Sequence, residues 1–285
     1  MLKLGFRHTA LQAVCTVFVL CFGVVLLGRG QAEMALAEEG VHLPVLMYHS
    51  ILKDSARQGQ YVISPSVLSA DLDALQQRGY QTVTVSDLLA YVYDGVSLPE
   101  KPVMITFDDG YYNNYVYAYP LLEQRGMRAV VSVIGSQTAQ YTENGVENAY
   151  WSHLRLDRLT EMQDVFEVQN HSWNLHEYGE RRGCLRRRGE DAESYASLLR
   201  EDTEQTQLLL TEAGLPAPTC YTYPFGACSE ESERILKEMG FLCTLGCEEK
   251  VNLVTNDPAC LYEMGRFNRP AGESTESYLH RALGE

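Results

Sequence analysis

The chain has 285 residues, a hydrophobic content of 45% and a formal net charge of −15 at pH 7. This composition is typical of a globular protein with one large core, and it excludes an intrinsically disordered chain. The acidic balance argues against nucleic acid as a partner, because no basic stripe is present to bind phosphates. We therefore expect one catalytic-size domain, and the sequence predicts no protein partner.

The N-terminal segment has the features of an export signal. Lys3 and Arg7 precede an apolar run over residues 10–27, and Ala35-Leu36-Ala37 offers a small-x-small cleavage site. The apolar run is near the lower limit for crossing a bilayer, so an uncleaved membrane anchor is an open alternative. We expect residues 1–37 to be a signal peptide or a membrane anchor. Residues 38–285 should then form the functional domain, secreted or membrane-anchored, outside the cytoplasm.

In the exported part, short apolar runs alternate with segments that have helical patterns. Predicted strands lie at residues 43–48, 82–85, 103–107, 129–134, 165–169, 219–223, 241–245 and 261–267. Predicted helices lie at residues 64–78, 86–95, 113–125, 191–213 and 229–239, with a longer excursion at 135–150. Ser64 with Pro65 predicts one helix start, and Ser86 is expected to cap the next helix. This α/β alternation predicts a distorted (β/α) barrel of about seven parallel strands, with an open doubly wound α/β sheet as the alternative.

The exported part contains an even number of cysteines. They are Cys184, Cys220, Cys228, Cys243, Cys247 and Cys260. Export permits disulfides, but sequence does not assign their pairing, and free thiols are the alternative. The Cys243-x3-Cys247 spacing lacks the second matched pair that a structural zinc site needs.

One apolar run ends abruptly in two adjacent carboxylates, Asp108 and Asp109, followed by Gly110. Like charges at the end of a buried strand raise one another's pKa unless a cation, a hydrogen-bond network or water neutralises them. A metal ion is one economical answer, and capping of the following helix is the other. In either α/β architecture the functional site lies at the carboxyl ends of the strands, which is where this pair is expected.

Other predicted strands also end in polar residues. His49 follows the first strand, whereas His171 and His176 follow the strand at residues 165–169. A spacing of five places two side chains about 140° apart on a helix and on opposite faces of a strand, so these histidines can converge only from a loop. Two imidazoles and one carboxylate make a facial set with open positions, suited to zinc and also to iron, cobalt or nickel. Ordinary surface or core roles are the alternative for the histidines.

These residues carry a resemblance to a known family. Thr106-Phe107-Asp108-Asp109-Gly110 and His171-Ser172-x3-His176 resemble the first two motifs of the polysaccharide deacetylases, the NodB-homology group also called carbohydrate esterase family 4. The resemblance covers roughly residues 43–267. Most of that family spaces its two histidines four apart. The spacing of five, together with the segment from Pro44 to Ser50, is similar to the poly-N-acetylglucosamine deacetylase branch.

The resemblance implies a role for each motif residue. Asp109, His171 and His176 would bind one divalent metal, with zinc the first choice and cobalt, nickel or iron the others. Asp108 would be the general base, His49 the general acid, and the backbone N–H of Phe225, in Tyr223-Pro224-Phe225-Gly226, the oxyanion donor. The arginine that usually precedes this proline is absent. Arg266 is a candidate substitute for orienting Asp108, and a plain surface arginine is the alternative.

The expected function is removal of N-acetyl groups from an amino-sugar polysaccharide of the cell envelope or extracellular matrix. The polymer would be poly-N-acetylglucosamine, peptidoglycan or chitin-like. One alternative is an O-acetyl esterase acting on xylan or another glycan, and the other is a catalytically silent glycan-binding envelope protein. Trp173, Tyr111 and Tyr112 could stack on sugar rings, although packing roles are equally compatible with their positions.

Overall fold

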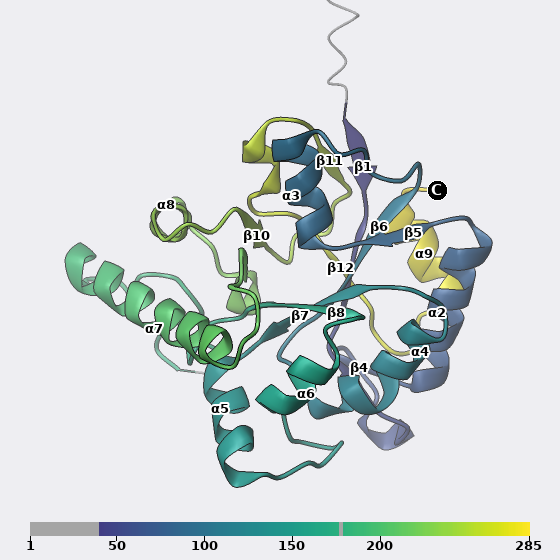
Figure 1. The fold of residues 1–285 in the computed structure, drawn as a ribbon, viewed down its shortest axis with the longest axis horizontal. Coiled ribbons are helices and arrows are strands. Elements are labelled where there is room, and N and C mark those ends of the chain that lie inside the picture. Colours follow the sequence, from purple (N-terminus) through teal and green to yellow (C-terminus); the bar gives the residue numbers. More distant parts are fainter. Residues whose placement is uncertain (1–39, 177–178) are drawn as a thin grey trace, which may run out of the picture. The chain divides into compact units, whose positions relative to one another are not determined.

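A parallel sheet of eight strands forms the centre of the protein (Figure 1). The computed structural model describes residues 40–176 and 179–285. The strand order is β10-β9-β8-β7-β6-β2-β12, and β5 also pairs with β6. The bounds are β2 (Val45–Tyr48), β5 (Gln81–Val83), β6 (Pro102–Phe107), β7 (Ala129–Val133), β8 (Phe166–Asn170), β9 (Cys220–Thr222), β10 (Cys243–Leu245) and β12 (Phe267–Asn268).

The two outer strands of this sheet are linked through the segment that precedes β12. The backbone N–H of Met264 donates to the Thr244 carbonyl, and the Met264 carbonyl accepts from Gly246, both at 2.9 Å. Leu245 and Met264 therefore form an isolated parallel bridge. The sheet is curled toward a barrel, which confirms the predicted distorted (β/α) barrel and rejects the open doubly wound sheet.

Helices follow most of the central strands and cover the sheet. Figure 1 shows α7 and α8 beside β10 on one side, and α2, α4 and α9 on the other. The bounds are α2 (Pro65–Gln77), α3 (Val85–Asp94), α4 (Tyr119–Glu123), α5 (Gly135–Asn144), α6 (Leu156–Glu161), α7 (Ala192–Glu212), α8 (Glu230–Glu238) and α9 (Thr275–Leu283). Ser64 caps α2 through its side chain and Pro65 opens the helix, as predicted.

Two small sheets were not predicted. β1 (Val41–Leu43) pairs antiparallel with β11 (Asn252–Val254), and β3 (Ser50–Ile51) pairs parallel with β4 (Val62–Ile63). Pro44 separates β1 from β2, so the single strand expected at residues 43–48 is divided. A proline has no N–H to contribute to a ladder, and a change of strand partner at this position is a natural result.

One element was not assigned from the sequence, and two predicted local features were wrong. The excursion at 135–150 contains helix α5, whose buried positions are Gly135, Thr138 and Tyr141, so no apolar periodicity announced it. Thr84 rather than Ser86 caps α3, through a capping box with Asp87. The strand expected at 261–267 is a 3-10 turn over Pro258–Leu261 followed by irregular chain, and only its last residue belongs to β12.

The six cysteines of the described region are all free, so the free-thiol alternative holds there. Cys220 and Cys243 are register partners on β9 and β10. Among the described residues Cys243 and Cys247 belong to no cluster that could hold a metal.

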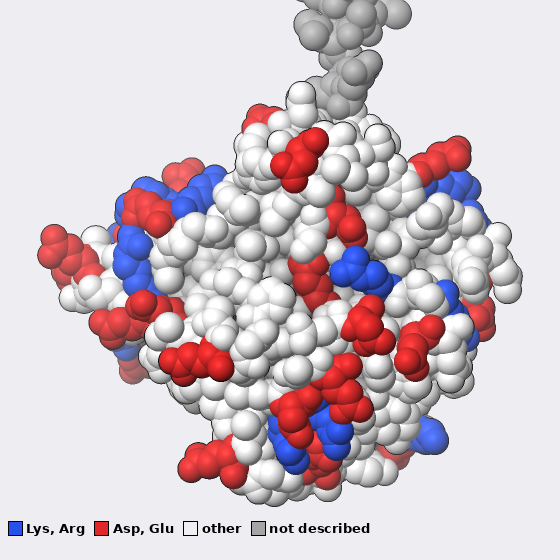
Figure 2. All heavy atoms as spheres, in the orientation of Figure 1, with Lys and Arg blue, Asp and Glu red and all other residues white. Residues whose placement is uncertain are grey.

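Residues 1–39 and 177–178 lie outside the described chain, so the predicted signal or anchor at 1–37 is not described. Over residues 40–176 and 179–285, no helix combines the length and apolarity that a membrane span requires. On the face seen in Figure 2, basic side chains are interspersed with acidic ones rather than gathered into a patch.

Candidate active site

The turn after β6 brings two carboxylates into the interior at the carboxyl end of the sheet. Asp108 and Asp109 are 3% and 6% exposed. Asp109 and Gly110 both have a φ of 68°, in the left-handed region that favours glycine. A Cβ on Gly110 would lie 2.8 Å from Cγ1 of Val133, so only glycine fits this position without a shift of β7. The turn therefore requires glycine at position 110, next to the two carboxylates.

Asp108 is held by a fully buried arginine. Nη1 of Arg266 donates to Oδ1 of Asp108 at 2.7 Å, and Nη2 donates to Oδ2 at 2.8 Å. The same guanidinium donates from Nε to the Gly246 carbonyl, and from Nη1 to Oγ1 of Thr106. Burial would raise the pKa of Asp108, but the charge and hydrogen bonds of Arg266 lower it below its usual value. The surface-arginine alternative is wrong, because the Arg266 side chain is 0% exposed.

His49 faces Asp108 from the end of β2. Its Nε2 lies 3.8 Å from Oδ2 of Asp108, and its ring lies against Tyr61 with centroids 4.8 Å apart. Burial lowers the pKa of His49, although the Asp108 and Asp109 charges oppose this shift. The Asn114 side chain donates to the His49 carbonyl at 2.8 Å and so ties β2 to the turn after β6. Burial therefore favours the neutral form of His49, whereas Arg266 favours the ionised form of Asp108.

Asp109, His171 and His176 converge into one cluster. Their ligand atoms lie within 4.8 Å of one another, with Oδ1 of Asp109 3.5 Å from Nε2 of His171 and 3.4 Å from Nε2 of His176. His171 makes a 2.7 Å hydrogen bond from Nδ1 to the Thr222 carbonyl, which places the proton on Nδ1 and leaves the Nε2 lone pair facing the carboxylate. Oδ1 of Asp109 and Nε2 of His171 are buried without a hydrogen-bond partner. This donor set fits a divalent metal ion with open coordination positions.

The third predicted motif forms a tight turn beside these ligands. Phe225 has a φ of 58° within the 3-10 turn Pro224–Gly226, and its ring lies 4.4 Å from that of His176. Gly226 is required here, because a Cβ would lie 2.7 Å from Cβ of Cys247. The structure thus brings the Phe225 side chain against one residue of the cluster. The role of the Phe225 backbone N–H as an oxyanion donor stays a prediction.

Some contributors to this site were not predicted from the sequence. Thr106 accepts from Arg266, Asn114 holds His49, and Asp202 of α7 binds the loop between the two histidines. The TFDDG motif offered a signal for Thr106, since a hydroxyl in an otherwise apolar strand needs a partner. Asp202 comes from a helix about 30 residues downstream of the loop, and nothing local announced it.

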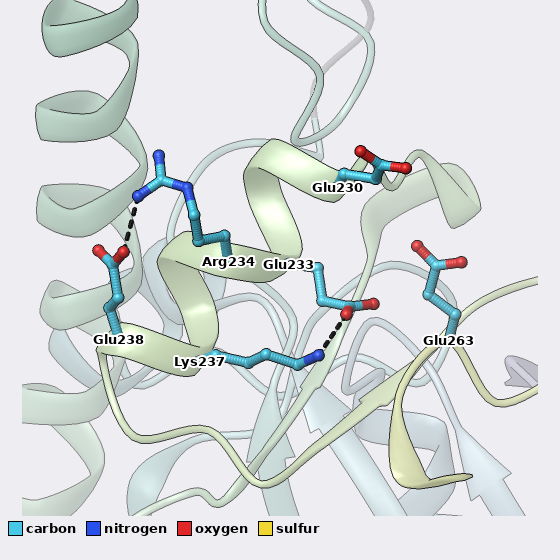
Figure 3. Close-up of a pocket in the computed structure, with 6 residues that line it drawn as sticks. All are labelled: Glu230, Glu233, Arg234, Lys237, Glu238 and Glu263. Atoms are coloured by element: carbon cyan, nitrogen blue, oxygen red, sulfur yellow. Dashed lines mark hydrogen bonds and ion pairs between the residues drawn. The ribbon is translucent and has the colours of Figure 1, made fainter. Parts of the chain in front are cut away.

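The aromatic residues considered for sugar stacking make contacts within the protein, and their stacking on sugar rings stays a prediction. Tyr111 stacks on His153 at 4.8 Å, Tyr112 stacks on Tyr115 at 5.9 Å, and Trp173 is half-buried. A surface pocket beside α8 has none of the candidate site's residues in its lining (Figure 3). Lys237 and Arg234 in its wall are paired with Glu233 and Glu238, whereas Glu230 and Glu263 have no cation of the wall as partner, so the pocket is acidic overall.

Comparison with known proteins identifies the family. The family model described as polysaccharide deacetylase matches residues 95–243, which is more than half of the chain. The chain belongs to the polysaccharide deacetylase family. The matched region contains the Asp-Asp-Gly turn, both loop histidines and the turn at Phe225.

Two curated relatives and one solved structure of this family are similar to the chain. YxkH of Bacillus subtilis is 33% identical over 144 residues, which are 46% of this chain and 50% of that protein. The poly-beta-1,6-N-acetyl-D-glucosamine N-deacetylase of Escherichia coli K12 is 26% identical over 219 residues, 69% of this chain and 32% of that protein. The chain thus matches half or less of the length of these relatives. IcaB from Ammonifex degensii has a TM-score of 0.67 at 26% identity, covering 86% of this chain and 97% of that one.

Proposed function

We propose that the protein is a metal-dependent hydrolase that removes N-acetyl groups from an amino-sugar polysaccharide of the poly-N-acetylglucosamine type. The observation that carries the proposal is the convergence of an Asp-His-His cluster, in which Oδ1 of Asp109 and Nε2 of His171 lack hydrogen-bond partners, with a second, arginine-bound carboxylate and a histidine. The similarity to poly-N-acetylglucosamine deacetylases over 69% of the chain supports this substrate class. Peptidoglycan and chitin-like polymers are the competing substrates.

Asp109, His171 and His176 would hold the metal, with zinc the first choice and cobalt, nickel or iron as substitutes. A divalent ion bound there supplies Lewis-acid polarisation of the acetyl carbonyl and lowers the pKa of water beside it. The protein holds the ligands ready for it. Nδ1 of His171 is fixed by the Thr222 carbonyl, and the nearby histidines keep the pKa of Asp109 far below its usual range despite burial.

Asp108 and His49 have complementary parts in this mechanism. Arg266 keeps Asp108 ionised and fixes both of its oxygens, so Asp108 is suited to accept the proton of the attacking water. Nε2 of His49 is 3.8 Å from Asp108, which is a short path for that proton. His49 would then deliver the proton to the departing amine nitrogen. The backbone N–H of Phe225 would stabilise the developing oxyanion.

The position of His49 favours an amide over an ester substrate. An amine leaving group is far more basic than an alcohol, so its departure depends on protonation. A histidine placed beside the general base meets that need, whereas an O-acetyl esterase has less use for it. Release of O-acetyl groups from xylan or another glycan is therefore the second outcome to be tested, and glycan binding without hydrolysis is the third.

Three exposed aromatic side chains would contact neighbouring sugar units, and one of them, Tyr61, borders His49. Tyr61, Tyr150 and Trp151 are 54%, 50% and 51% exposed. The Tyr61 ring contacts His49, and Arg57, from the connection between β3 and β4, lies over Tyr150 at 5.5 Å. Flat aromatic faces suit the apolar faces of pyranose rings, and the net charge of −15 suits a polymer that becomes cationic as acetyl groups are removed.

The proposal includes the location of the enzyme. Residues 1–37 would direct export or anchor the chain through residues 10–27, and residues 38–285 would form the catalytic domain outside the cytoplasm. Within the latter, Val41–Glu285 form one compact unit. The N-terminal residue of the protein recovered from its host, read by mass spectrometry, tests whether the segment is cleaved.

Acetate release tests the proposed activity directly. Protein stripped with a chelator should release acetate from poly-N-acetylglucosamine only after zinc, cobalt, nickel or iron is added back. Acetylxylan, peptidoglycan and chitin serve as the competing substrates. Faster release from acetylxylan would favour the esterase, and no release from any polymer under any metal would contradict the proposal.

A further inference from the structure

Side chains bind every backbone N–H in the loop between the two ligand histidines. Ser172, which has a φ of 70°, donates its N–H to Oδ1 of Asn170 at 2.8 Å. Trp173 and Asn174 donate to the two oxygens of Asp202 at 2.9 and 2.8 Å, and Leu175 donates to Oγ of Ser172 at 3.1 Å. The conformation of this loop therefore depends on particular side chains and not on regular secondary structure.

Asp202 is the only distant member of this set. It lies on α7 and its carboxylate is nearly buried, with an exposure of 8%. Among the described residues no lysine, arginine or histidine forms an ion pair with it. The Asp202 carboxylate instead accepts two charge-assisted hydrogen bonds from backbone N–H groups. Such bonds are roughly twice as strong as hydrogen bonds between neutral groups.

The loop is also fixed to the start of α5. The N–H groups of Gly135 and Ser136 donate to the carbonyls of Ser172 and Trp173 at 2.9 and 3.1 Å. A Cβ on Gly135 would lie 2.7 Å from Cε3 of Trp173, so the Trp173 ring packs directly on this glycine. The loop is thus held from α5 on one side and from α7 on the other, and His176 follows it immediately.

We infer that Asp202 is a positioning residue that sets the metal affinity of the site by fixing the loop from His171 to His176. His171 has its own anchor, the Thr222 carbonyl, whereas the place of His176 depends on the path of the loop. A spacing of five residues between the histidines does not bring their rings together on any regular element, so an external clamp is needed. Asp202 provides it through both of its oxygens. The inference rests on the proposed metal site.

Metal affinity tests this role without reference to acetate release. Zinc and cobalt binding to stripped full-length protein would be measured by competition with a chromogenic chelator for Asp202→Ala, Asp202→Asn and Glu201→Gln. Glu201 is an exposed neighbour on α7 that lines the same surface hollow as Asn174 and Leu175. Within the described chain it makes no hydrogen bond to the loop, so its variant removes the same charge and leaves the loop's hydrogen bonds in place. We expect Asp202→Ala to bind each metal about 10- to 100-fold more weakly, Asp202→Asn to lie between, and Glu201→Gln to match wild type.

Hydrogen exchange supplies the second readout. In Asp202→Ala the amides of Trp173 and Asn174 should exchange faster, while those of β7 should keep wild-type protection. If β7 also loses protection, Asp202→Ala is unfolded, and the metal affinity and amide exchange of Asp202→Asn are compared with those of Glu201→Gln instead. The inference would be overturned if Asp202→Ala bound metal within twofold of the affinity of Glu201→Gln. It would also be overturned if the amides of Trp173 and Asn174 exchanged in Asp202→Ala at the wild-type rate. Wild-type protein that binds metal but releases no acetate would contradict the proposed function and leave this inference standing.

Discussion

Replacement of Arg266 by methionine should destabilise the protein and disable Asp108 together. The guanidinium is 0% exposed and donates to both oxygens of a carboxylate that is itself 4% exposed. Removing one partner of a buried pair leaves the other charged and unpaired, which costs about 3–5 kcal/mol. For a domain of this size that corresponds to a fall of about 6–20 °C in Tm.

A double-mutant cycle separates this effect from a simple loss of packing. Urea unfolding of Arg266→Met, Asp108→Asn and the double variant gives the coupling free energy. We expect a coupling free energy of at least about 1.5 kcal/mol. In Asp108→Asn the side chain at position 108 is neutral, so removing Arg266 from that variant leaves no buried unpaired carboxylate and costs less than in wild type. If the two costs add to within about 0.5 kcal/mol, the bidentate pair does not stabilise the fold.

The same variants test the catalytic part of the argument. Arg266→Met should lower kcat for deacetylation by at least about 100-fold, since a displaced base no longer lines up with the attacking water. Arg266→Lys keeps the charge but cannot donate to both oxygens at once, so its kcat should fall between those of wild type and Arg266→Met. A lysine variant as active as wild type would mean that charge alone, and not the geometry of the fork, positions Asp108.

Three further predictions concern other parts of the site. His49→Ala should slow acetate release from N-acetylglucosamine oligomers by about 100- to 1,000-fold but affect 4-nitrophenyl acetate less than tenfold, because a phenolate departs without protonation; equal losses would contradict the general-acid role. Trp151→Ala should lower kcat/KM by about 3- to 10-fold on an N-acetylglucosamine hexamer and hardly at all on the dimer. Replacement of the similarly exposed Tyr93 by alanine is the control, and a loss that does not depend on oligomer length would reject the sugar contact. Gly110→Ala should destabilise the protein by at least about 1 kcal/mol more than Gly145→Ala in urea unfolding, since both glycines have a positive φ but only Gly110 lacks space for a Cβ; equal costs would refute the steric argument.

Much of the fold could be predicted because the central strands are buried on both faces. β6 and β7 are wholly buried and are apolar apart from one hydroxyl residue each, and Ser64-Pro65 marks the start of α2 by a local cap and a fixed φ. Helix α5 could not be predicted in this way, because glycine, threonine and tyrosine form its buried face. The last strand failed for a different reason. Glu263 has a φ of 51°, and the chain there bonds to β10 instead of extending as a strand.

Only some of the residues of the candidate site could be predicted from the sequence. Asp108, Asp109 and the two loop histidines come soon after predicted parallel strands. The carboxyl ends of parallel strands lie at one end of the sheet, so these residues are expected there together. Arg266 could only be suggested, because its contact with Asp108 spans 158 residues of sequence. The role of Asp202 could not be predicted from the sequence. Its partners are backbone N–H groups, which almost every residue type has, so the residues that donate to it carry no sequence signal.

The central claim is that one metal ion, held by Asp109, His171 and His176, makes this protein a deacetylase. Stripped protein at a concentration well above the metal dissociation constant would be titrated with zinc, and the initial rate of acetate release from N-acetylglucosamine hexamer recorded at each step. We predict a linear rise that ends at one zinc per chain, and no rise in a His176→Ala variant. Full activity without metal, or an equal rise in that variant, would contradict the claim.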